Sequence, residues 1–134
     1  MRRISAFLLA LLVVGAALVG CSPATSPAIF DRDRTAEDEL PAGLTAEVNA
    51  DTSRYVGEDS AGNRFWVVQT AELNGTCIIL VDVDTDAPWS GCGGPPIALT
   101  IESGLRVELA DYPDQLSESN AELIGDTLLV GSPR

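Results

Sequence analysis

The residues of this chain with the most defined chemistry are its three cysteines, Cys21, Cys77 and Cys92. Cys77 and Cys92 are too far apart for a Cys-x-x-Cys redox motif. If Cys21 carries a lipid, as the N-terminal pattern implies, Cys77 and Cys92 remain as an even pair. In an oxidising compartment such a pair predicts a disulfide. The disulfide would close a loop of about 15 residues and stabilise the fold by about 3 kcal/mol. Trp89 is then expected to pack beside this disulfide rather than to form part of a binding surface.

A second chemical pattern is the D-x-D-x-D run formed by Asp82, Asp84 and Asp86. These residues are weak candidates for calcium ligands. An EF-hand loop starting at Asp82 needs glycine at its sixth position and glutamate at its twelfth, and this chain has Ala87 and Gly93 there. The run therefore predicts a solvated, acidic hairpin end, with a looser Ca²⁺ site as the alternative. We predict no metal and no cofactor.

Catalytic groups are scarce. The chain contains no histidine, and all eight of its basic residues are arginines. A histidine-assisted nucleophile, an imidazole proton shuttle and a histidine-containing zinc site are therefore excluded. Neither a phosphate-binding glycine loop nor a G-x-S-x-G motif occurs. Neighbouring acids could pair as in a glycosidase, but 20 acidic residues make chance pairs certain. The acids considered are Glu37, Asp38, Glu39, Glu58 and Asp59.

The N-terminus carries a targeting pattern. Arg2 and Arg3 precede an uncharged apolar run over residues 4–19, which ends in Leu18-Val19-Gly20-Cys21. The pattern resembles a bacterial lipoprotein signal, which implies that residues 1–20 are removed and that Cys21 takes a diacylglyceryl group and a further acyl chain such as palmitate. The run is shorter than the roughly 20 residues of a spanning helix, so an uncleaved membrane helix is the less favoured alternative. We expect a lipid anchor at the extracytoplasmic face of the cell membrane.

The charge of the mature chain points away from polyanionic partners. All 20 acidic residues and six of the eight basic residues lie after position 20, which leaves a mature net charge near −14. Binding to nucleic acid and electrostatic binding to anionic lipid both rest on basic residues, so neither is predicted. High net charge of this kind usually serves solubility.

We expect three segments along the chain: a signal peptide over residues 1–20, a lipidated flexible tether over residues 21–34, and a small β-rich domain over residues 35–134. Within the tether, Ile29 and Phe30 are apolar and could instead dock onto the domain. Thr35 followed by acidic residues predicts the start of a short helix, which Pro41 limits to one or two turns.

From residue 54 onward the pattern is that of β-strands. Residues 64–71 and 76–83 flank Asn74-Gly75, the strongest short hairpin signal, and a two-residue turn there would place Trp66 opposite Val83. Both faces of this hairpin are apolar, so it is expected to be covered on both sides. Residues 97–102 suit a short helix, although their alternation also fits a strand. Residues 105–109, 122–124 and 127–130 predict the remaining strands. The fold class is therefore α+β and β-rich: a small antiparallel sheet with one or two short helices and one disulfide.

Several segments together resemble small uncharacterised lipoproteins and secreted proteins of high-GC actinobacteria. The resemblance rests on Arg34-Thr35-Ala36-Glu37-Asp38-Glu39-Leu40-Pro41, Arg54-Tyr55-Val56-Gly57-Glu58, Gly62-Asn63-Arg64-Phe65-Trp66, Gly75-Thr76-Cys77-Ile78-Ile79-Leu80-Val81, Trp89-Ser90-Gly91-Cys92 and Ile124-Gly125-Asp126-Thr127-Leu128-Leu129-Val130. It implies architecture and location, and no activity. We expect a non-enzymatic binding or interaction module of the cell envelope, with an unknown envelope protein or ligand as its partner. The alternatives are a carboxylate-based hydrolase of envelope glycans and a cation-binding domain.

Overall fold

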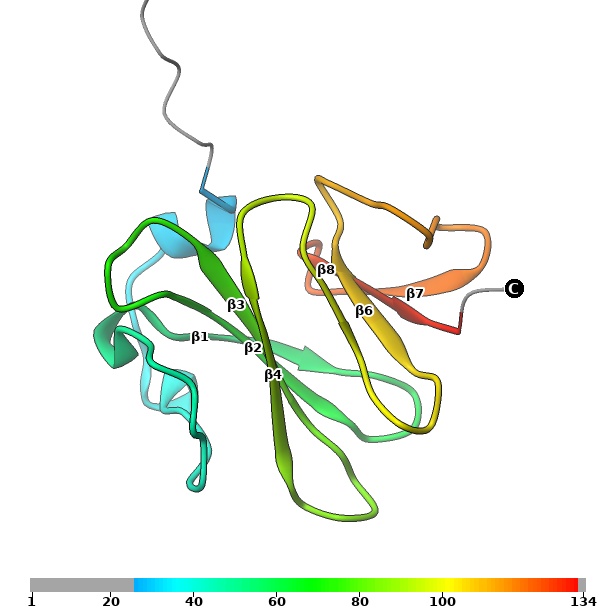
Figure 1. The fold of residues 1–134 in the computed structure, drawn as a ribbon, viewed down its shortest axis with the longest axis horizontal. Helices are drawn as coiled ribbons and strands as arrows, with labels where there is room; N and C mark the ends of the chain where they lie inside the picture. Colours follow the sequence, from blue (N-terminus) through cyan, green and yellow to red (C-terminus); the bar gives the residue numbers. More distant parts are fainter. Residues whose placement is uncertain (1–25, 133–134) are drawn as a thin grey trace, which may run out of the picture.

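The computed structural model describes residues 26–132, which form two four-stranded antiparallel sheets (Figure 1). The order of the first sheet is β1 (Arg54–Glu58), β2 (Arg64–Gln69), β3 (Thr76–Val81), β4 (Pro88–Gly93). The order of the second is β5 (Ala98–Thr100), β6 (Arg106–Leu109), β8 (Leu128–Gly131), β7 (Ala121–Ile124). Within these described residues, the helical part consists only of single 3-10 turns: η1 (Ala28–Asp31), η2 (Ala36–Asp38) and η3 (Ala50–Thr52). The predicted β-rich fold class is confirmed.

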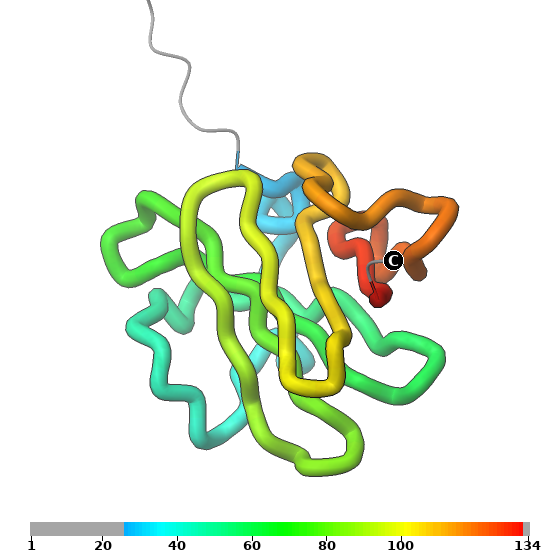
Figure 2. The backbone as a smooth tube through the Cα atoms, turned by 45° about the vertical axis from the view of Figure 1, so that its right-hand side comes forward, coloured from blue at the N-terminus to red at the C-terminus, as the bar shows by residue number. Residues whose placement is uncertain are grey.

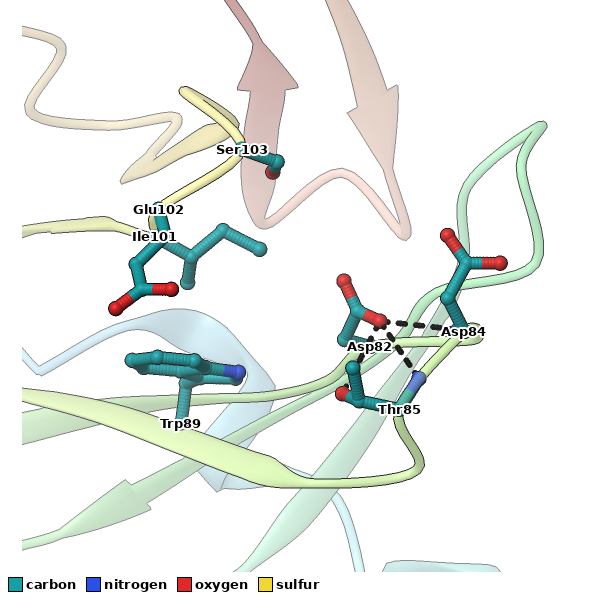
Figure 3. A pocket seen from close by; sticks show the side chains of 7 residues that line it. All are labelled: Asp82, Asp84, Thr85, Trp89, Ile101, Glu102 and Ser103. Atoms are coloured by element: carbon teal, nitrogen blue, oxygen red, sulfur yellow. Dashed lines mark hydrogen bonds between the residues drawn. The ribbon is translucent and has the colours of Figure 1, made fainter.

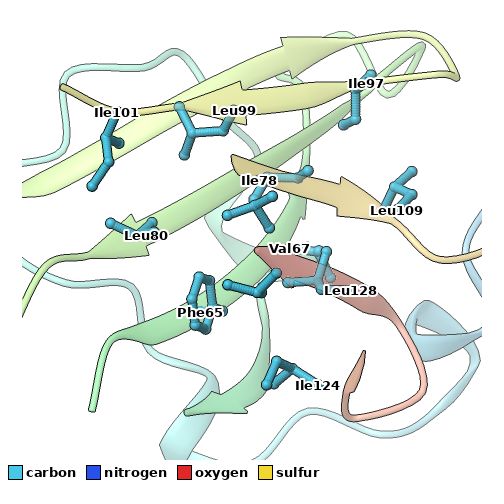
Figure 4. Packing of buried hydrophobic residues seen from close by; sticks show 12 residues of the cluster. Phe65, Val67, Ile78, Leu80, Ile97, Leu99, Ile101, Leu109, Ile124 and Leu128 are labelled. Carbon is cyan, nitrogen blue, oxygen red and sulfur yellow. The ribbon is translucent and has the colours of Figure 1, made fainter. Parts of the chain in front are cut away.

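The main core lies between the two sheets (Figure 4). Side chains of a strand alternate between its faces, so every second residue of each central strand points inward. The inward residues of the first sheet are Phe65, Val67, Ile78 and Leu80, and those of the second include Leu99, Val107, Leu109, Leu128 and Val130. Burial of this apolar surface is the main force that holds the sheets together.

The outer face of the first sheet is also covered. Trp66, Val68 and Ile79 are buried there, under Leu40, Leu44 and Val48 from the irregular segment that precedes β1. The prediction that the β2–β3 hairpin is apolar and covered on both faces is therefore confirmed. Strands buried on two faces need continuous apolar runs, which is what residues 65–68 and 77–81 supply.

The predicted register of this hairpin is wrong by four residues. Trp66 lies opposite Ile79, not Val83. Asn74-Gly75 is not a two-residue turn, because the loop begins at Thr70, whose N–H donates to the Gly75 carbonyl (3.0 Å) and whose hydroxyl accepts from the Gly75 N–H (3.1 Å). Leu73, and not Asn74, takes the positive φ of the loop. Because the shift is an even number, each side chain keeps its predicted face.

The predicted helix at residues 97–102 is likewise wrong, and the strand alternative is right. Residues 98–100 form β5, which pairs with β6. Ile97, Leu99 and Ile101 are buried in the core, while Thr100 and Glu102 are exposed. The period-two apolar pattern prevails because this segment completes the second sheet.

The predicted helix start at Thr35 is confirmed as the single turn η2, with Thr35 and Asp38 forming a capping box. Residues 26–34 belong to the segment expected to be a tether, and within them Ile29 and Phe30 pack against the main core. The tube in Figure 2 shows this blue segment lying against the body of the domain. The predicted signal peptide and Cys21 lie outside the described residues. Within residues 26–132, no helix has the length and apolar character needed to cross a membrane.

Cys77 and Cys92 form the predicted disulfide. They are directly opposite each other on β3 and β4, and Cys77 is fully buried on the outer face of the first sheet. The bond therefore fastens the edge strand β4 to a central strand.

We expect the double variant Cys77→Ala/Cys92→Ala to lose about 3 kcal/mol of unfolding free energy, because its unfolded chain regains the entropy of a 15-residue loop. Urea unfolding followed by circular dichroism would measure the loss. A reductant should destabilise the natural chain by a similar amount and leave the double variant unchanged. Equal stability of both proteins without reductant would contradict the prediction.

Candidate functional site

A small pocket lies between the turn that joins β3 to β4 and the turn that joins β5 to β6 (Figure 3). Its volume is about 190 Å³. It is lined by Asp82, Asp84, Thr85, Trp89, Ile101, Glu102 and Ser103. The pocket therefore combines an aromatic ring, an aliphatic side chain, two hydroxyls and three carboxylates, and no basic residue lines it.

The acidic wall is built by the β3–β4 turn. Oδ1 of Asp82 accepts hydrogen bonds from the backbone N–H groups of Asp84 (2.9 Å) and Thr85 (3.0 Å), and from the Thr85 hydroxyl (3.2 Å). Aspartate commonly bonds the backbone two residues ahead in this way, which is why it recurs in turns. The turn closes with the Asp86 N–H donating to the Asp82 carbonyl (2.8 Å). Asp82 is thus held in one orientation beside Trp89.

The opposite wall comes from the β5–β6 turn. Ile101 is buried, and its backbone pairs with Leu105 (3.0 Å) and Gly104 (2.9 Å). Gly104 takes φ +86°, a conformation that glycine adopts at little cost, so the chain reverses sharply here. Glu102 and Ser103 are therefore held at the tip of the turn, where they face the pocket across from Asp82 (Figure 3).

Trp89 forms the floor of the pocket. It lies on β4 opposite Leu80, half-buried, and packs against the main core. In Figure 3 its ring lies flat beneath Ile101 and Glu102. The expectation that Trp89 packs beside the disulfide is wrong, because side chains alternate along a strand and residues 89 and 92 occupy opposite faces of β4.

The three aspartates considered as calcium ligands do not gather. Asp82 and Asp84 line the pocket, but Asp86 forms an exposed ion pair with Arg64 (3.0 Å) on another part of the surface. Within residues 26–132, no three acidic or cysteine side chains lie close enough together to hold a metal ion. The looser calcium site considered from the sequence is therefore not assembled here.

The other acids considered from the sequence have different surroundings. Asp38 is fully buried and paired with Arg32. Asp59 accepts the N–H groups of residues 61 and 63 in its own turn, at 3.0 and 2.9 Å. Glu37 and Glu58 line a common depression, which is open and measures about 330 Å³.

In that depression the polar groups already bind one another. The Trp66 indole N–H donates to the Glu37 carbonyl (3.3 Å), and the Arg64 guanidinium lies 5.8 Å from the centre of the Trp66 ring. The Tyr55 hydroxyl contacts Glu58 (3.4 Å), and burial, together with this carboxylate, raises the pKa of Tyr55. The indole, the guanidinium and the phenol of this depression therefore already interact within the domain, and the Trp89 pocket is the better candidate.

Sequence reasoning identified Asp82 and Asp84 but missed Trp89, Glu102 and Ser103 as partners in one site. Glu102 and Ser103 were obscured by the wrong helix at residues 97–102. A signal for Trp89 was present, since it lies an odd number of residues from Cys92 and hence on the face away from the disulfide.

Comparison with protein-family models, with curated proteins and with solved structures found no match to this chain.

Proposed function

We propose that this protein is an extracytoplasmic lipoprotein, anchored to the cell membrane through Cys21, that acts as a non-enzymatic binding module of the envelope. The Trp89 pocket would be its binding site. The observation that carries the proposal is the placement of this pocket at the end of the domain away from the point where the chain enters it.

The entry point is fixed by contacts of Arg54, the first residue of β1. Its guanidinium donates to the carbonyls of Arg32 (2.9 Å) and Phe30 (3.4 Å). In the register of the sheet, Arg54 pairs with Val67 of β2, and Val67 pairs with Ile78 of β3. The entry segment therefore contacts the half of the first sheet where β1 begins. It lies at the top of Figure 1.

The pocket lies at the other end of the same sheet. β1 ends at Glu58, which is level with Arg64 and Val81, and Asp82 follows Val81 directly. The turn that bears Asp82 and Asp84 extends beyond this end, at the bottom of Figure 1.

This arrangement has a consequence for a lipid-anchored chain. Pro27 is the sixth residue after Cys21, and even a fully extended chain spans at most about 20 Å between them. With two or more acyl chains inserted in the bilayer, the entry end would stay close to the membrane. The Trp89 pocket would then face away from it, towards the outer layers of the envelope, where a ligand or partner has access.

The proposal predicts that a label at the entry end lies nearer to the bilayer than a label at the pocket end. Gly94→Cys and Ser103→Cys form a suitable pair. Gly94 follows the end of β4, where Gly93 pairs with Thr76 at the end of the sheet away from Asp82, and no heavy atom lies within 4 Å of an added Cβ. Ser103 lines the pocket and is exposed. In the full chain in vesicles, a lipid-attached quencher should reduce the fluorescence of a label at position 94 more than at position 103.

Mass measurement of the membrane-extracted protein provides the control. It should show a mature chain that begins at a lipid-modified Cys21, and Cys21→Ser should prevent this modification. Detection of Met1 on the membrane-extracted chain, an unmodified Cys21, or equal quenching at both positions would each contradict the proposal.

A further inference from the structure

We infer that the Trp89 pocket binds an organic cation: the guanidinium or ammonium head of a single basic group. The inference deepens the proposed binding function and rests on it, because it names the ligand class of the same site. Four features of the pocket support it, namely its size, its aromatic floor, its charge and a matching arrangement elsewhere in the domain.

The size of the pocket sets the size of its ligand. Its volume of about 190 Å³ is below the range of about 300 to 1,000 Å³ typical of pockets for drug-sized ligands and cofactors. It suits a group as large as one side-chain head. A long glycan or a nucleotide would lie mostly outside it.

The aromatic floor favours a positive group. A tryptophan ring attracts a cation placed within about 6 Å of its centre more strongly than other aromatic rings do. The Trp89 ring lies flat beneath Glu102 (Figure 3), so a cation above the ring would lie between an aromatic face and a carboxylate.

The charge of the pocket walls also favours a positively charged ligand. Asp82, Asp84 and Glu102 are the charged residues that line the pocket. Oδ1 of Asp82 takes three hydrogen bonds, whereas Oδ2 accepts none from residues 26–132, and it is therefore available to a donor in the pocket. The net charge of −12 of the whole chain would also attract cations over longer distances.

The domain contains an internal example of this arrangement. At Trp66, the guanidinium of Arg64 lies 5.8 Å from the ring centre, and Asp86 binds the same guanidinium at 3.0 Å. A tryptophan, a cation and a carboxylate are thus assembled within one chain. The Trp89 pocket repeats the tryptophan and the carboxylates, but no residue that lines it supplies the cation. A cationic ligand, or a basic side chain of a partner, would take the place that Arg64 has at Trp66.

The test uses the full chain in a non-ionic polyoxyethylene detergent, with the indole N–H signals of its two tryptophans followed by NMR. Tetramethylammonium and arginine methyl ester should each shift the Trp89 signal saturably, with a Kd on the order of 1 mM. Trp66 serves as an internal control, because its indole N–H already donates to the Glu37 carbonyl and the Arg64 guanidinium already lies over its ring. Sodium chloride at the same concentration should produce no saturable shift.

The variants Glu102→Gln and Asp84→Asn should each weaken binding by about two- to fivefold, as expected for exposed charge pairs. Glu118→Gln, an exposed acid in the loop after β6, is the matched control and should bind as the natural chain does. Trp89→Leu lacks the reporting indole, so its binding is followed through the backbone amide signals of residues 82–85, which should no longer shift with either cation. The unchanged Trp66 signal checks its fold.

The source of the cation is distinguished by comparing ligands. Tighter binding of the tripeptide Gly-Arg-Gly than of tetramethylammonium would identify a basic side chain of a protein partner, and the reverse would identify a free quaternary ammonium compound; either supports the inference. The inference would be overturned if none of the cations produced a saturable shift of the Trp89 signal. It would also be overturned if N-acetylglucosamine bound and the cations did not. Neither result would affect the lipid anchor, which is measured by mass.

Discussion

Replacement of Asp38 by alanine is expected to lower the free energy of unfolding by about 3 to 5 kcal/mol, because hydrogen bonds to a charged acceptor are worth about 1.5 to 3 kcal/mol each and two backbone N–H groups would lose theirs. The Asp38 side chain has no exposed surface. Its carboxylate accepts two hydrogen bonds from the Arg32 guanidinium (2.6 and 2.7 Å), one from the Thr35 N–H (2.6 Å) and one from the Tyr55 N–H (2.6 Å). Loss of Asp38 therefore releases both the entry segment and the start of β1.

The effect of Asp38 should depend on pH. Hydrogen bonds from Arg32, opposed by burial and helped by the backbone N–H groups, hold the pKa of the Asp38 carboxyl far below its usual range. A carboxyl whose pKa is lowered on folding stabilises the native state above its unfolded pKa, near 3.9, and this stabilisation is lost as the pH falls. The difference in stability between the natural chain and Asp38→Ala should be full at pH 7 and shrink below about pH 4.

Urea unfolding at several pH values would measure both effects. Glu37→Gln is the matched control, since its exposed side chain is adjacent in sequence and its removal should change stability by less than about 0.5 kcal/mol. A loss in Asp38→Ala no larger than in this control, or a difference that stays constant between pH 7 and pH 2, would refute the role given to Asp38.

The second large effect is expected at Glu108, where alanine should also cost about 3 to 5 kcal/mol. Glu108 lies on β6 and has no exposed surface. Its carboxylate pairs with Arg106 and accepts the backbone N–H groups of residues 114, 115 and 116, at distances from 2.7 to 3.1 Å. Burial raises the pKa of Glu108, but these hydrogen bonds together outweigh burial and leave it lowered. The carboxylate thus holds the loop between β6 and β7 against the second sheet, and Leu116 is buried with it.

Hydrogen exchange and urea unfolding together test this role. In Glu108→Ala, the amides of residues 114–116 should lose their protection, because their acceptor is gone and the loop opens to water. Glu118→Ala, an exposed glutamate of the same loop, should leave both exchange and stability close to those of the natural chain. Protection of these three amides in Glu108→Ala would show that another group holds the loop.

Local patterns in the sequence determined several parts of this domain. The remaining pair of cysteines, Cys77 and Cys92, predicted the disulfide, Thr35 predicted the helical turn η2, and the apolar runs predicted a hairpin covered on both faces. The absence of histidine and lysine excluded whole classes of catalysis. These properties depend on composition, or on residues close together in the chain, so a sequence carries them directly.

Only the tertiary structure decided the rest. The register of β2 and β3 depended on the side chain of Thr70 in the loop, and the strand at β5 depended on pairing with β6. Asp38 looks like any other acid in the sequence, yet its partner Tyr55 lies 17 residues away. The Trp89 pocket likewise forms from two turns that belong to different sheets. Such contacts arise because burial brings distant segments together, and the hydrogen bonds that then form have no counterpart in local spacing.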